Sequence, residues 1–390
     1  MKSLAIRTGG TVEWKKLVNS ILLSLPAFLI LWFFTTRGRI PEPDIEGMSA
    51  LISILYLSIL FFLMQYTGKT YSYRKLLFVS IALSFPIPFI SNLIAARGSM
   101  TINAEELLSS SVPFCHLVIP MVFVPAALSK TIIFPGSLFD GHANISMMLA
   151  IWIAASIALG KGWCSWVCFY GGWDEGFSNF GGKKRMLKLD RKWTYLPYAV
   201  LIGIILTSAI SLSPTYCQWL CPFKAVTEFH EVNSVTAAIQ FFIFASLFIG
   251  LVMVLPILTG KRVQCTVLCP FVVFQALTNK INIFDIRIDK DKCKNCKTCI
   301  RLCPTISIQE KNLQKGKTGM TCNKCGRCVD NCPKGAVTYH IKGTGIGVNP
   351  AIARNVFLYA ALVFVATMGS SMIAGAVNKI LLLITTGSMI

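Results

Sequence analysis

Histidine is scarce in this sequence, which has four in 390 residues: His116, His142, His230 and His340. None is paired with another on facing membrane segments, as a b-type haem would require. No Cys-x-x-Cys-His motif is present for covalent haem attachment. The sequence therefore argues against a haem protein.

Acidic residues are also few, 17 against 37 lysines and arginines, which gives a formal net charge of +20. A basic chain could bind nucleic acid, but 54% of the residues are hydrophobic, which is too many for a soluble domain. A bilayer explains the charge better if the basic residues lie on one side of it. We therefore expect a multi-pass membrane protein that contacts lipid and has no nucleic-acid partner.

Apolar segments of about the length that a helix needs to cross a membrane recur along the chain. They cover roughly residues 17–36, 49–67, 76–96, 143–160, 195–213, 236–258 and 355–376. The first is not a signal peptide, because its apolar run is long and no small-residue cleavage site follows. A further apolar segment, residues 112–136, contains four prolines and is expected to be broken or re-entrant.

The distribution of lysine and arginine sets the expected orientation. In a seven-span arrangement the outer loops hold few of them, Arg37, Arg39, Arg97, Lys130 and Lys224. Counting residues 112–136 as an eighth span would break this asymmetry. We therefore expect an inner (plasma) membrane protein whose N-terminus lies in the cytoplasm, together with the loop that follows the sixth span.

That loop carries the most specific motif of the sequence. "CKNCKTCIRLCP" supplies Cys293, Cys296, Cys299 and Cys303, and "CNKCGRCVDNCP" supplies Cys322, Cys325, Cys328 and Cys332. This is the spacing of two-cluster bacterial ferredoxins, in which the fourth cysteine of each motif ligates the other [4Fe-4S] cluster. Cys332 should therefore complete the first set and Cys303 the second. Two zinc sites are the alternative, which the tandem copies and the prolines after each motif disfavour.

Short alternating runs flank these motifs. "INIFDIRID" precedes the first motif and "AVTYHI" follows the second. Alternation of apolar and polar residues is typical of a half-buried strand. Both runs are therefore predicted to be small strands of the ferredoxin-like domain.

Six further cysteines form three Cys-x-x-x-Cys pairs near span ends. The pairs are Cys164 with Cys168, Cys217 with Cys221, and Cys265 with Cys269. A spacing of four places both thiols on one helix face. One such pair could be ordinary packing, since cysteine is common in buried helices. Three pairs in similar settings favour a redox role.

The three cysteine pairs are expected at two different depths in the membrane. Cys164, Cys168, Cys265 and Cys269 follow inward-running spans and could supply the four thiolates of one cluster. Cys217 and Cys221 are expected in an outer loop, a hydrocarbon thickness of roughly 30 Å away. The remaining cysteine, Cys115, lies in the proline-rich segment on that side. These three could form a separate outer site, or else an idle or redox-active thiol pair with Cys115 as packing.

The spans, the membrane cysteine pairs and the two ferredoxin motifs together resemble the NapH-type membrane iron-sulfur proteins. The resemblance covers roughly residues 76–342 and implies electron transfer through the paired and ferredoxin cysteines. It implies kinship with a quinol dehydrogenase subunit associated with periplasmic nitrate reductase and with a cytochrome oxidase assembly protein. This chain departs from the pattern at Phe169, which stands where proline usually follows the second cysteine, and in its third pair.

The expected fold is a membrane all-α bundle of about seven transmembrane helices plus a re-entrant segment. An α+β, two-[4Fe-4S] ferredoxin-like domain is inserted into it. We expect a transmembrane domain over residues 1–280, the cytoplasmic ferredoxin-like domain over 281–345, and a last helix and tail over 346–390.

Two functions fit these expectations. The first is an electron-transfer or quinol dehydrogenase subunit of a larger redox complex, which passes electrons between a quinone pool or outer donor and an inner partner. The second is an assembly factor that reduces a metal or a disulfide of another protein. Catalytic residues are not identified.

Other polar residues have weaker assignments. Asp174 and Glu175 are expected to cap or solvate a helix start, with proton handling as the minority alternative, and Gly171 and Gly181 to act as loop hinges. Basic residues beside the ferredoxin motifs could dock an acidic soluble carrier or simply be solvated: Lys292, Lys294, Lys297, Lys324, Arg327 and Lys334. Candidates for proton handling, alternatively ordinary loop groups, are Glu105, Glu106, His116, Asp140 and His142.

Overall fold

Long apolar helices dominate the structure, a computed structural model that describes residues 5–87, 145–180, 186–211, 215–227, 234–345 and 349–388. The first three helices are α1 (Ala5–Thr36), α2 (Ile45–Thr67) and α3 (Thr70–Ser84). Asp44 caps α2 by accepting a hydrogen bond from the Gly47 N–H at 2.7 Å, and the left-handed Gly68 ends it.

The middle of the chain alternates longer helices with short irregular turns. Its helices are α7 (Ile145–Ala158), η2 (Gly160–Gly162), α8 (Trp163–Trp166), α9 (Phe169–Phe180), η3 (Arg191–Tyr195), α10 (Leu196–Ser211), η4 (Tyr216–Leu220), α11 (Lys224–Thr227), α12 (Val235–Leu247), η5 (Phe248–Val254), α13 (Leu255–Thr259), η6 (Gln264–Leu268) and α14 (Phe271–Ile281). The chain ends with α18 (Pro350–Phe364), η7 (Val365–Gly369) and α19 (Ser370–Thr386).

Five helical stretches among the described residues are long and apolar enough to cross a membrane: Glu13–Thr36, Ile45–Thr67, Arg191–Ser211, Val235–Thr259 and Pro350–Thr386. The predicted span 143–160 corresponds to a helix pair bent by 110° between Leu149–Ala158 and Gly160–Trp166, which would make a sixth. The predicted span 76–96 is only partly covered, because the description stops at residue 87. Residues 112–136 lie outside the described part.

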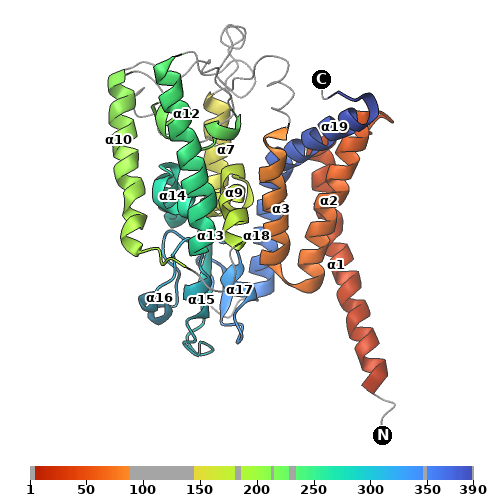
Figure 1. The fold of residues 1–390 in the computed structure, drawn as a ribbon. Coiled ribbons are helices and arrows are strands. Elements are labelled where there is room, and N and C mark those ends of the chain that lie inside the picture. The colour runs from red at the N-terminus through yellow and green to blue at the C-terminus, as the bar shows by residue number, and fades with distance from the viewer. Residues whose placement is uncertain are drawn as a thin grey trace.

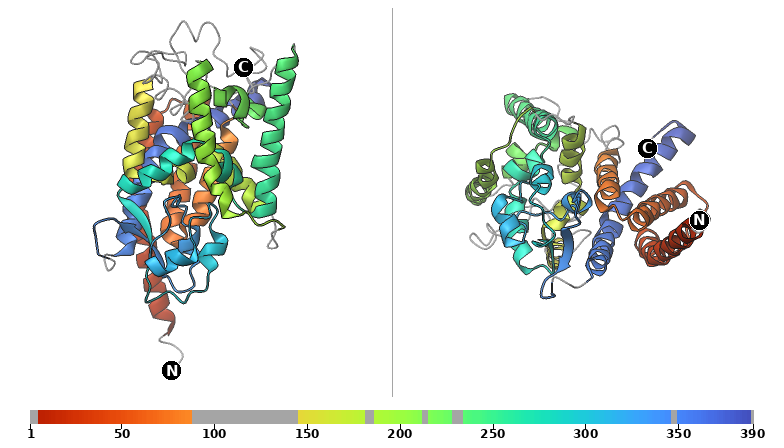
Figure 2. Two further views of the ribbon diagram at one scale, coloured as in Figure 1. Left: turned by 90° about the vertical axis from the view of Figure 1, so that its left-hand side faces the viewer. Right: turned by 90° about the horizontal axis from the view of Figure 1, so that it is seen from below.

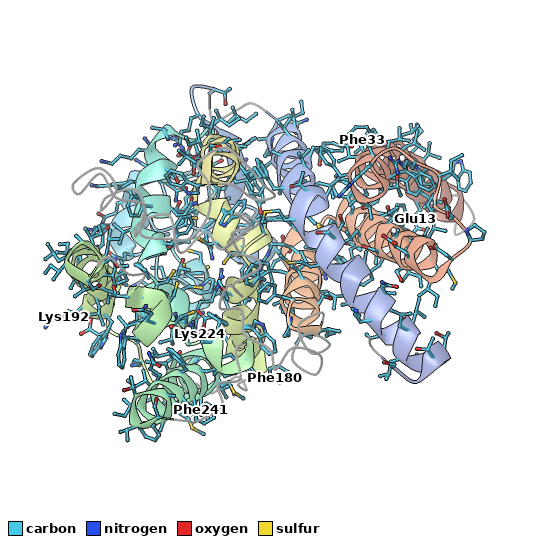
Figure 3. All side chains as sticks on the ribbon, turned by 90° about the horizontal axis from the view of Figure 1, so that it is seen from above. Glu13, Phe33, Phe180, Lys192, Lys224 and Phe241 are labelled. Atoms are coloured by element: carbon cyan, nitrogen blue, oxygen red, sulfur yellow. The ribbon has the colours of Figure 1, made fainter. Side chains whose placement is uncertain are left out.

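The outer faces of these helices carry exposed apolar side chains. Phe33 on α1 is 61% exposed and Phe241 on α12 is 44% exposed. In the view from above both lie at the periphery, on opposite sides of the helices (Figure 3). Exposed apolar area of this extent suits contact with lipid.

A small α+β module follows α14. Its strands β1 (Phe284–Ile288) and β2 (Val337–Ile341) pair antiparallel, with Phe284 opposite Ile341, which confirms both predicted strands. Between them lie α15 (Thr298–Leu302), α16 (Glu310–Lys315) and α17 (Arg327–Asp330). The module packs on the membrane helices through Phe357 of α18, whose ring lies 5.0 Å from that of Tyr339.

The N-terminus and the α+β module lie at the same end of the helices, and the C-terminus lies at the opposite end (Figure 1). The left-hand view in Figure 2 shows the module beneath the long helices, beside the protruding start of α1. This arrangement agrees with the expectation that both lie on one side of the membrane.

Candidate metal centres

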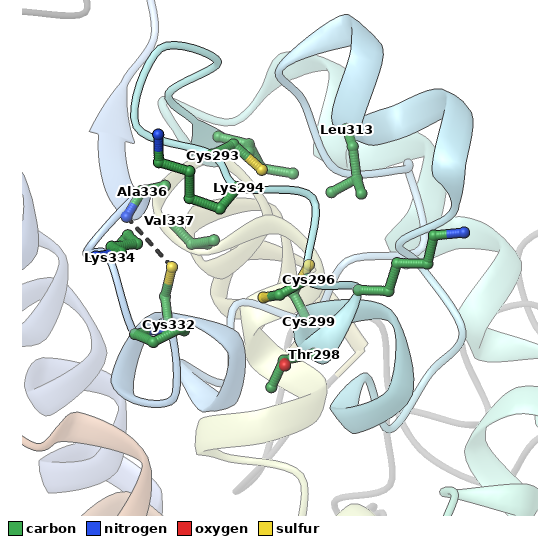
Figure 4. A pocket seen from close by; sticks show the side chains of 13 residues that line it. Cys293, Lys294, Cys296, Thr298, Cys299, Leu313, Cys332, Lys334, Ala336 and Val337 are labelled. Carbon is green, nitrogen blue, oxygen red and sulfur yellow. Dashed lines mark hydrogen bonds between the residues drawn. The ribbon is translucent and has the colours of Figure 1, made fainter.

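The first cysteine set of the module surrounds a cavity at its surface. Cys293 and Cys296 come from the loop after β1, Cys299 from α15, and Cys332 from the turn after α17 (Figure 4). The backbone N–H of Ala336 donates to Cys332 Sγ at 3.2 Å. The structure thus places Cys332 with the first motif, although it belongs to the second motif in the sequence.

The second cysteine set lies deeper. Cys303, Cys325 and Cys328 are buried, and the Cys328 thiol interacts electrostatically with Cys322, Cys325 and Cys303. Burial raises the pKa of Cys325 to about 12, while the guanidinium of Arg74 acts in the opposite direction. The Ser307 N–H donates to Cys303 Sγ at 3.2 Å, which repeats the contact between Ala336 and Cys332 in the first set.

The two motifs share one backbone conformation. Asn295 and Lys324, each two residues after the first cysteine of its motif, are left-handed with φ of 51° and 52°. Lys297 and Gly326, each four residues after that cysteine, are also left-handed. Left-handed residues of this kind make tight turns, so the first three cysteines of each motif lie on one short, folded loop. The module is therefore an internal repeat that exchanges its fourth cysteines.

Buried polar contacts attach the second cysteine set to the membrane helices. Asn279 of α14 accepts a hydrogen bond from Lys324 Nζ at 2.6 Å and donates to the Cys322 carbonyl at 2.8 Å. Lys324 Nζ also donates to the Leu159 carbonyl at 3.1 Å. From the other side, Asp330 accepts from the Tyr71 N–H at 2.6 Å, at the start of α3. The module is thereby fixed relative to the helices.

A second cavity lies among the membrane helices. Cys164, Cys168, Cys265 and Cys269 line it together, as the sequence predicts for the two inner pairs. Each pair follows a left-handed glycine, Gly160 with φ of 54° and Gly260 with φ of 63°, which turns the chain after α7 and α13. Glycine adopts this left-handed conformation without a steric penalty, whereas residues with a Cβ atom adopt it only at an energetic cost.

Buried cations accompany these four thiols. Arg262 is fully buried and donates to Cys265 Sγ at 3.4 Å and to the Cys164 carbonyl at 2.6 Å. Lys161 is 2% exposed and its N–H donates to Asn279 Oδ1 at 2.9 Å, while the amide nitrogen of Asn279 donates to the Cys322 carbonyl at 2.8 Å. The turn that carries Lys161 therefore lies close to both the membrane cavity and the second ferredoxin set.

The expectation that Asp174 and Glu175 cap or solvate a helix start is wrong. Both are fully buried on α9. Glu175 forms an ion pair with Arg74 and lies 3.9 Å from Arg262, while Asp174 accepts from the Cys265 N–H at 2.8 Å. They are buried because α9 packs between α3 and the segment that carries Arg262. Their carboxylates therefore lie near arginine side chains and are not in contact with water.

Gly171 is likewise not a loop hinge, because it lies within α9. A Cβ atom at this position would lie 2.1 Å from Arg262 Nη2 and 2.7 Å from the Cys164 carbonyl. Glycine is needed here so that the arginine can reach the cavity. Gly181 lies outside the described residues.

The predicted separation of roughly 30 Å between Cys217 with Cys221 and the inner pairs is wrong. Tyr216 and Phe223, on either side of the third pair, line the same cavity as the four inner cysteines. The side chain of Gln264, next to Cys265, donates to the Tyr216 hydroxyl at 3.4 Å. The third pair therefore lies beside the inner site, not a membrane thickness away.

The physical reason is a return of the chain along α10. The Thr215 hydroxyl lies 2.9 Å from that of Thr207 and 2.8 Å from that of Ser208, so the chain after α10 folds back against the helix. The segment with Cys217 and Cys221 is consequently packed inside the protein. Cys221 is 6% exposed.

Several predicted residues lie outside the part of the chain that the structure describes. They are Glu105, Glu106, Cys115, His116, Asp140 and His142. Among the described residues, no three histidine, cysteine or acidic side chains converge as one metal ion would require; the thiols surround cavities instead.

Arg74, Glu175 and Asn279 are not predicted as parts of the thiol sites. The sequence signal for Arg74 and Glu175, as for Arg262, is a charged side chain in or beside a strongly apolar segment, which is uncommon without a buried partner. Asn279 is uncharged and carries no such signal.

Two family profiles match parts of the chain. The profile described as "4Fe-4S dicluster domain" matches residues 285–341, and the profile described as "4Fe-4S binding domain" matches three times, at 141–188, 193–231 and 241–289. Each of the three membrane matches contains one cysteine pair.

Curated relatives give the same picture. The ferredoxin-type protein NapH of Escherichia coli is 24% identical over 231 residues, which cover 56% of this chain and 76% of that protein. The chain is a NapH-like iron-sulfur membrane protein. YccM of the same organism, named as an electron transport protein, is 27% identical over 51% of this chain.

The NapH-like match is partial. The aligned part spans 56% of the length of YccM, and the uncharacterized protein MJ0749 of Methanocaldococcus jannaschii is 26% identical over 50% of this chain and 70% of its own length. No solved structure matches the chain. Iron-sulfur electron transport is therefore supported as a class, and the finer function is a proposal.

Proposed function

We propose that this NapH-like protein is a membrane electron-transfer subunit of a larger redox complex. It would pass electrons between a quinone pool or outer-face donor and a cytoplasmic partner, as a quinol dehydrogenase subunit does. The observation that carries the proposal is the position of Asn279, whose side chain accepts from the Lys161 N–H, three residues before Cys164, at 2.9 Å and donates to the Cys322 carbonyl at 2.8 Å. Two thiol sites that are joined through one side chain are close neighbours.

The cysteine sets assign the ligands. Cys293, Cys296, Cys299 and Cys332 would hold one [4Fe-4S] cluster, and Cys322, Cys325, Cys328 and Cys303 a second. Cys164, Cys168, Cys265 and Cys269 would hold a third, within the membrane domain. When bound, such clusters supply one-electron carriers.

The residues around each set fit an anionic cluster. Four thiolates outweigh the positive charge of the iron-sulfur core, and a buried net charge is costly unless it is compensated. Arg262 and Lys161 supply buried positive charge at the membrane cavity. At Cys303 and Cys332, backbone N–H groups donate to sulfur, a contact that tunes cluster potentials.

A gradient of exposure suggests the order of electron transfer. Cys296 in the first set is exposed, Cys325 and Cys328 in the second set are buried, and the membrane cavity lies beyond them. The first set would exchange electrons with a soluble partner. Lys294, Lys297 and Lys334 line that cavity and would favour an acidic carrier.

The orientation follows from charge asymmetry. We infer seven spans plus a re-entrant segment over residues 112–136, with the N-terminus and the ferredoxin-like domain in the cytoplasm. The division into residues 1–280, 281–345 and 346–390 belongs to the same proposal. Both cytoplasmic parts lie at one end of the helices, which supports it (Figure 1).

The third pair would form a further site. Cys217, Cys221 and Cys115 could supply three thiolates, with a fourth ligand such as His116, another group, water or substrate. The position of the Cys217 segment beside the membrane cavity means that this site would lie next to the third cluster. An electron arriving there from a quinol would have a short path inward.

The proposal is tested by iron counting. Cys164→Ser combined with Cys168→Ser should lower iron and sulfide by one cluster per chain and leave the ferredoxin signals intact. The matched variant Cys217→Ser with Cys221→Ser should leave the third cluster in place. Unchanged iron in the first variant would rule out the membrane cluster.

The second candidate function is an assembly factor that reduces a metal or a disulfide of another protein. It is favoured by the packing of Cys217 and Cys221 beside the membrane cavity, where a thiol pair could exchange electrons with a cluster. Oxidation of the reduced protein by a quinone analogue favours the conduit. Failure with every quinone, together with reduction of copper or of a partner disulfide, favours the assembly role.

A further inference from the structure

Three charged side chains join the second ferredoxin set to the membrane cavity. Arg74 of α3 and Arg327, which follows Cys325 by two residues, both lie over the Tyr71 ring, 5.3 and 5.2 Å from its centroid. At the other end, Arg262 donates to Cys265 Sγ at 3.4 Å. Glu175 of α9 contacts both arginines, as an ion pair with Arg74 and at 3.9 Å from Arg262. A continuous line of charge thus runs from Cys325 to Cys265.

These charges are shielded from water. Arg74 and Arg262 are 0% exposed and Glu175 is 1% exposed, so solvent screens their interactions little. Their positions are also fixed: Arg74 donates to the Ser165 carbonyl at 2.6 Å and Arg262 to the Ser165 hydroxyl at 3.0 Å.

Packing helices through buried charged side chains carries a large desolvation cost. Buried ion pairs often add little stability over apolar residues of similar volume. Here Arg74 Nε, Arg262 Nε and Glu175 Oε2 have no hydrogen-bond partner among the described residues. Unlike apolar residues, these buried charges create a fixed electric field at the two thiol sites.

We propose that Arg74, Glu175 and Arg262 form a charge bridge that sets the reduction potentials of the second ferredoxin cluster and the membrane cluster together. The inference rests on the proposed function, since it requires both clusters. In the step concerned, one electron would pass between the cluster at Cys325 and the cluster at Cys265, and no proton or covalent bond would change place.

The sign of each contribution follows from charge. Reduction adds one negative charge to a cluster, so a nearby cation raises the potential and a nearby anion lowers it. Arg74 acts mainly on the cluster at Cys325, and Arg262 on the cluster at Cys265. Glu175 contacts both arginines and lowers both potentials, so it offsets part of the rise that each arginine causes.

The test is a redox titration of the purified full chain, followed by the paramagnetic signals of the reduced clusters. Glu175→Gln should raise both potentials so that each reduction equilibrium shifts at least tenfold, about 59 mV for a one-electron couple. Arg74→Gln should lower only the reduction potential of the second ferredoxin cluster. Arg262→Gln should lower only the reduction potential of the membrane cluster. Glu175→Asp and Arg262→Lys, which keep the charge, should restore the potentials.

The matched control is Glu310→Gln. Glu310 pairs with Lys297 beside the first ferredoxin set, but its side chain is 69% exposed, so solvent should screen the loss of its charge. Opposite shifts in the Glu175 and Arg74 variants cannot come from misfolding, which would remove signals without moving them. Full iron content with unmoved potentials overturns the charge bridge alone, whereas a chain without iron at the membrane cavity overturns the proposed function as well.

Discussion

Asn279 of α14 accepts a hydrogen bond from Lys324 of the ferredoxin-like module at 2.6 Å. The same amide oxygen accepts from the Lys161 N–H at 2.9 Å, and the amide nitrogen donates to the Cys322 carbonyl at 2.8 Å. One side chain therefore positions the module, the second cysteine set and the turn before Cys164 relative to one another.

Asn279→Ala should loosen the docking of the module. The variant removes a charge-assisted hydrogen bond and several neutral ones, so we expect a loss of about 3 kcal/mol in stability. Hydrogen exchange at residues 320–324 should become faster, while exchange in α2 stays slow. Asn331→Ala, which removes an exposed side chain that donates to the Arg327 carbonyl at 2.9 Å, is the control and should leave exchange unchanged.

Gly171→Ala should disturb the membrane cavity. The added Cβ would lie 2.1 Å from Arg262 Nη2, so the arginine must leave its place beside Cys265. Overpacking of this kind costs about 1–3 kcal/mol. We expect a lower thermal midpoint and loss of the membrane cluster's signal.

Gly176→Ala is the matched change on the same helix. Its Cβ would meet Val79 at 3.6 Å, an ordinary contact. This variant should keep all signals and a similar thermal midpoint. Equal behaviour of the two alanine variants would contradict the close approach of Arg262 to α9.

Iron should leave the sites in a fixed order when a chelator is added. The first ferredoxin set includes the exposed Cys296, whereas Cys325 and Cys328 are buried. The signal of the first cluster should therefore decay before those of the second and the membrane clusters. The measurement is released iron against the decay of each paramagnetic signal, and faster loss from the membrane site would contradict the exposure gradient.

Charge reversal beside the first set should slow electron exchange with a soluble partner. Lys294 and Lys334 line that cavity. Lys294→Glu with Lys334→Glu should reduce the rate with an acidic soluble ferredoxin at least tenfold at low ionic strength, with the difference shrinking as salt is added. Lys192→Glu, on the exposed turn before α10, is the control, and an equal loss there would argue against a specific docking face.

The sequence was sufficient for the cysteine sets because ligand spacing is local. Motifs of a few residues fix which thiols share a loop, and the exchange of Cys303 and Cys332 follows from the internal repeat. The strands at residues 284–288 and 337–341 were predictable from alternation.

The charge bridge was not predictable in this way. Arg74, Glu175 and Arg262 are far apart in the sequence, and only the packing of α9 between α3 and the segment after α13 brings them together. The depth of Cys217 is not predictable from the sequence for a related reason. Charge counting places a loop on one side of a membrane, but it does not detect a segment that folds back against the end of the preceding helix through Thr215.

The central claim is that Cys164, Cys168, Cys265 and Cys269 hold a cluster next to the second ferredoxin cluster. The most direct test is a map of the iron positions in the anaerobically purified protein by anomalous diffraction. We expect iron between these four sulfurs, in addition to two iron centres in the ferredoxin-like module. Iron confined to the module, with the membrane cavity empty in fully loaded protein, would contradict it.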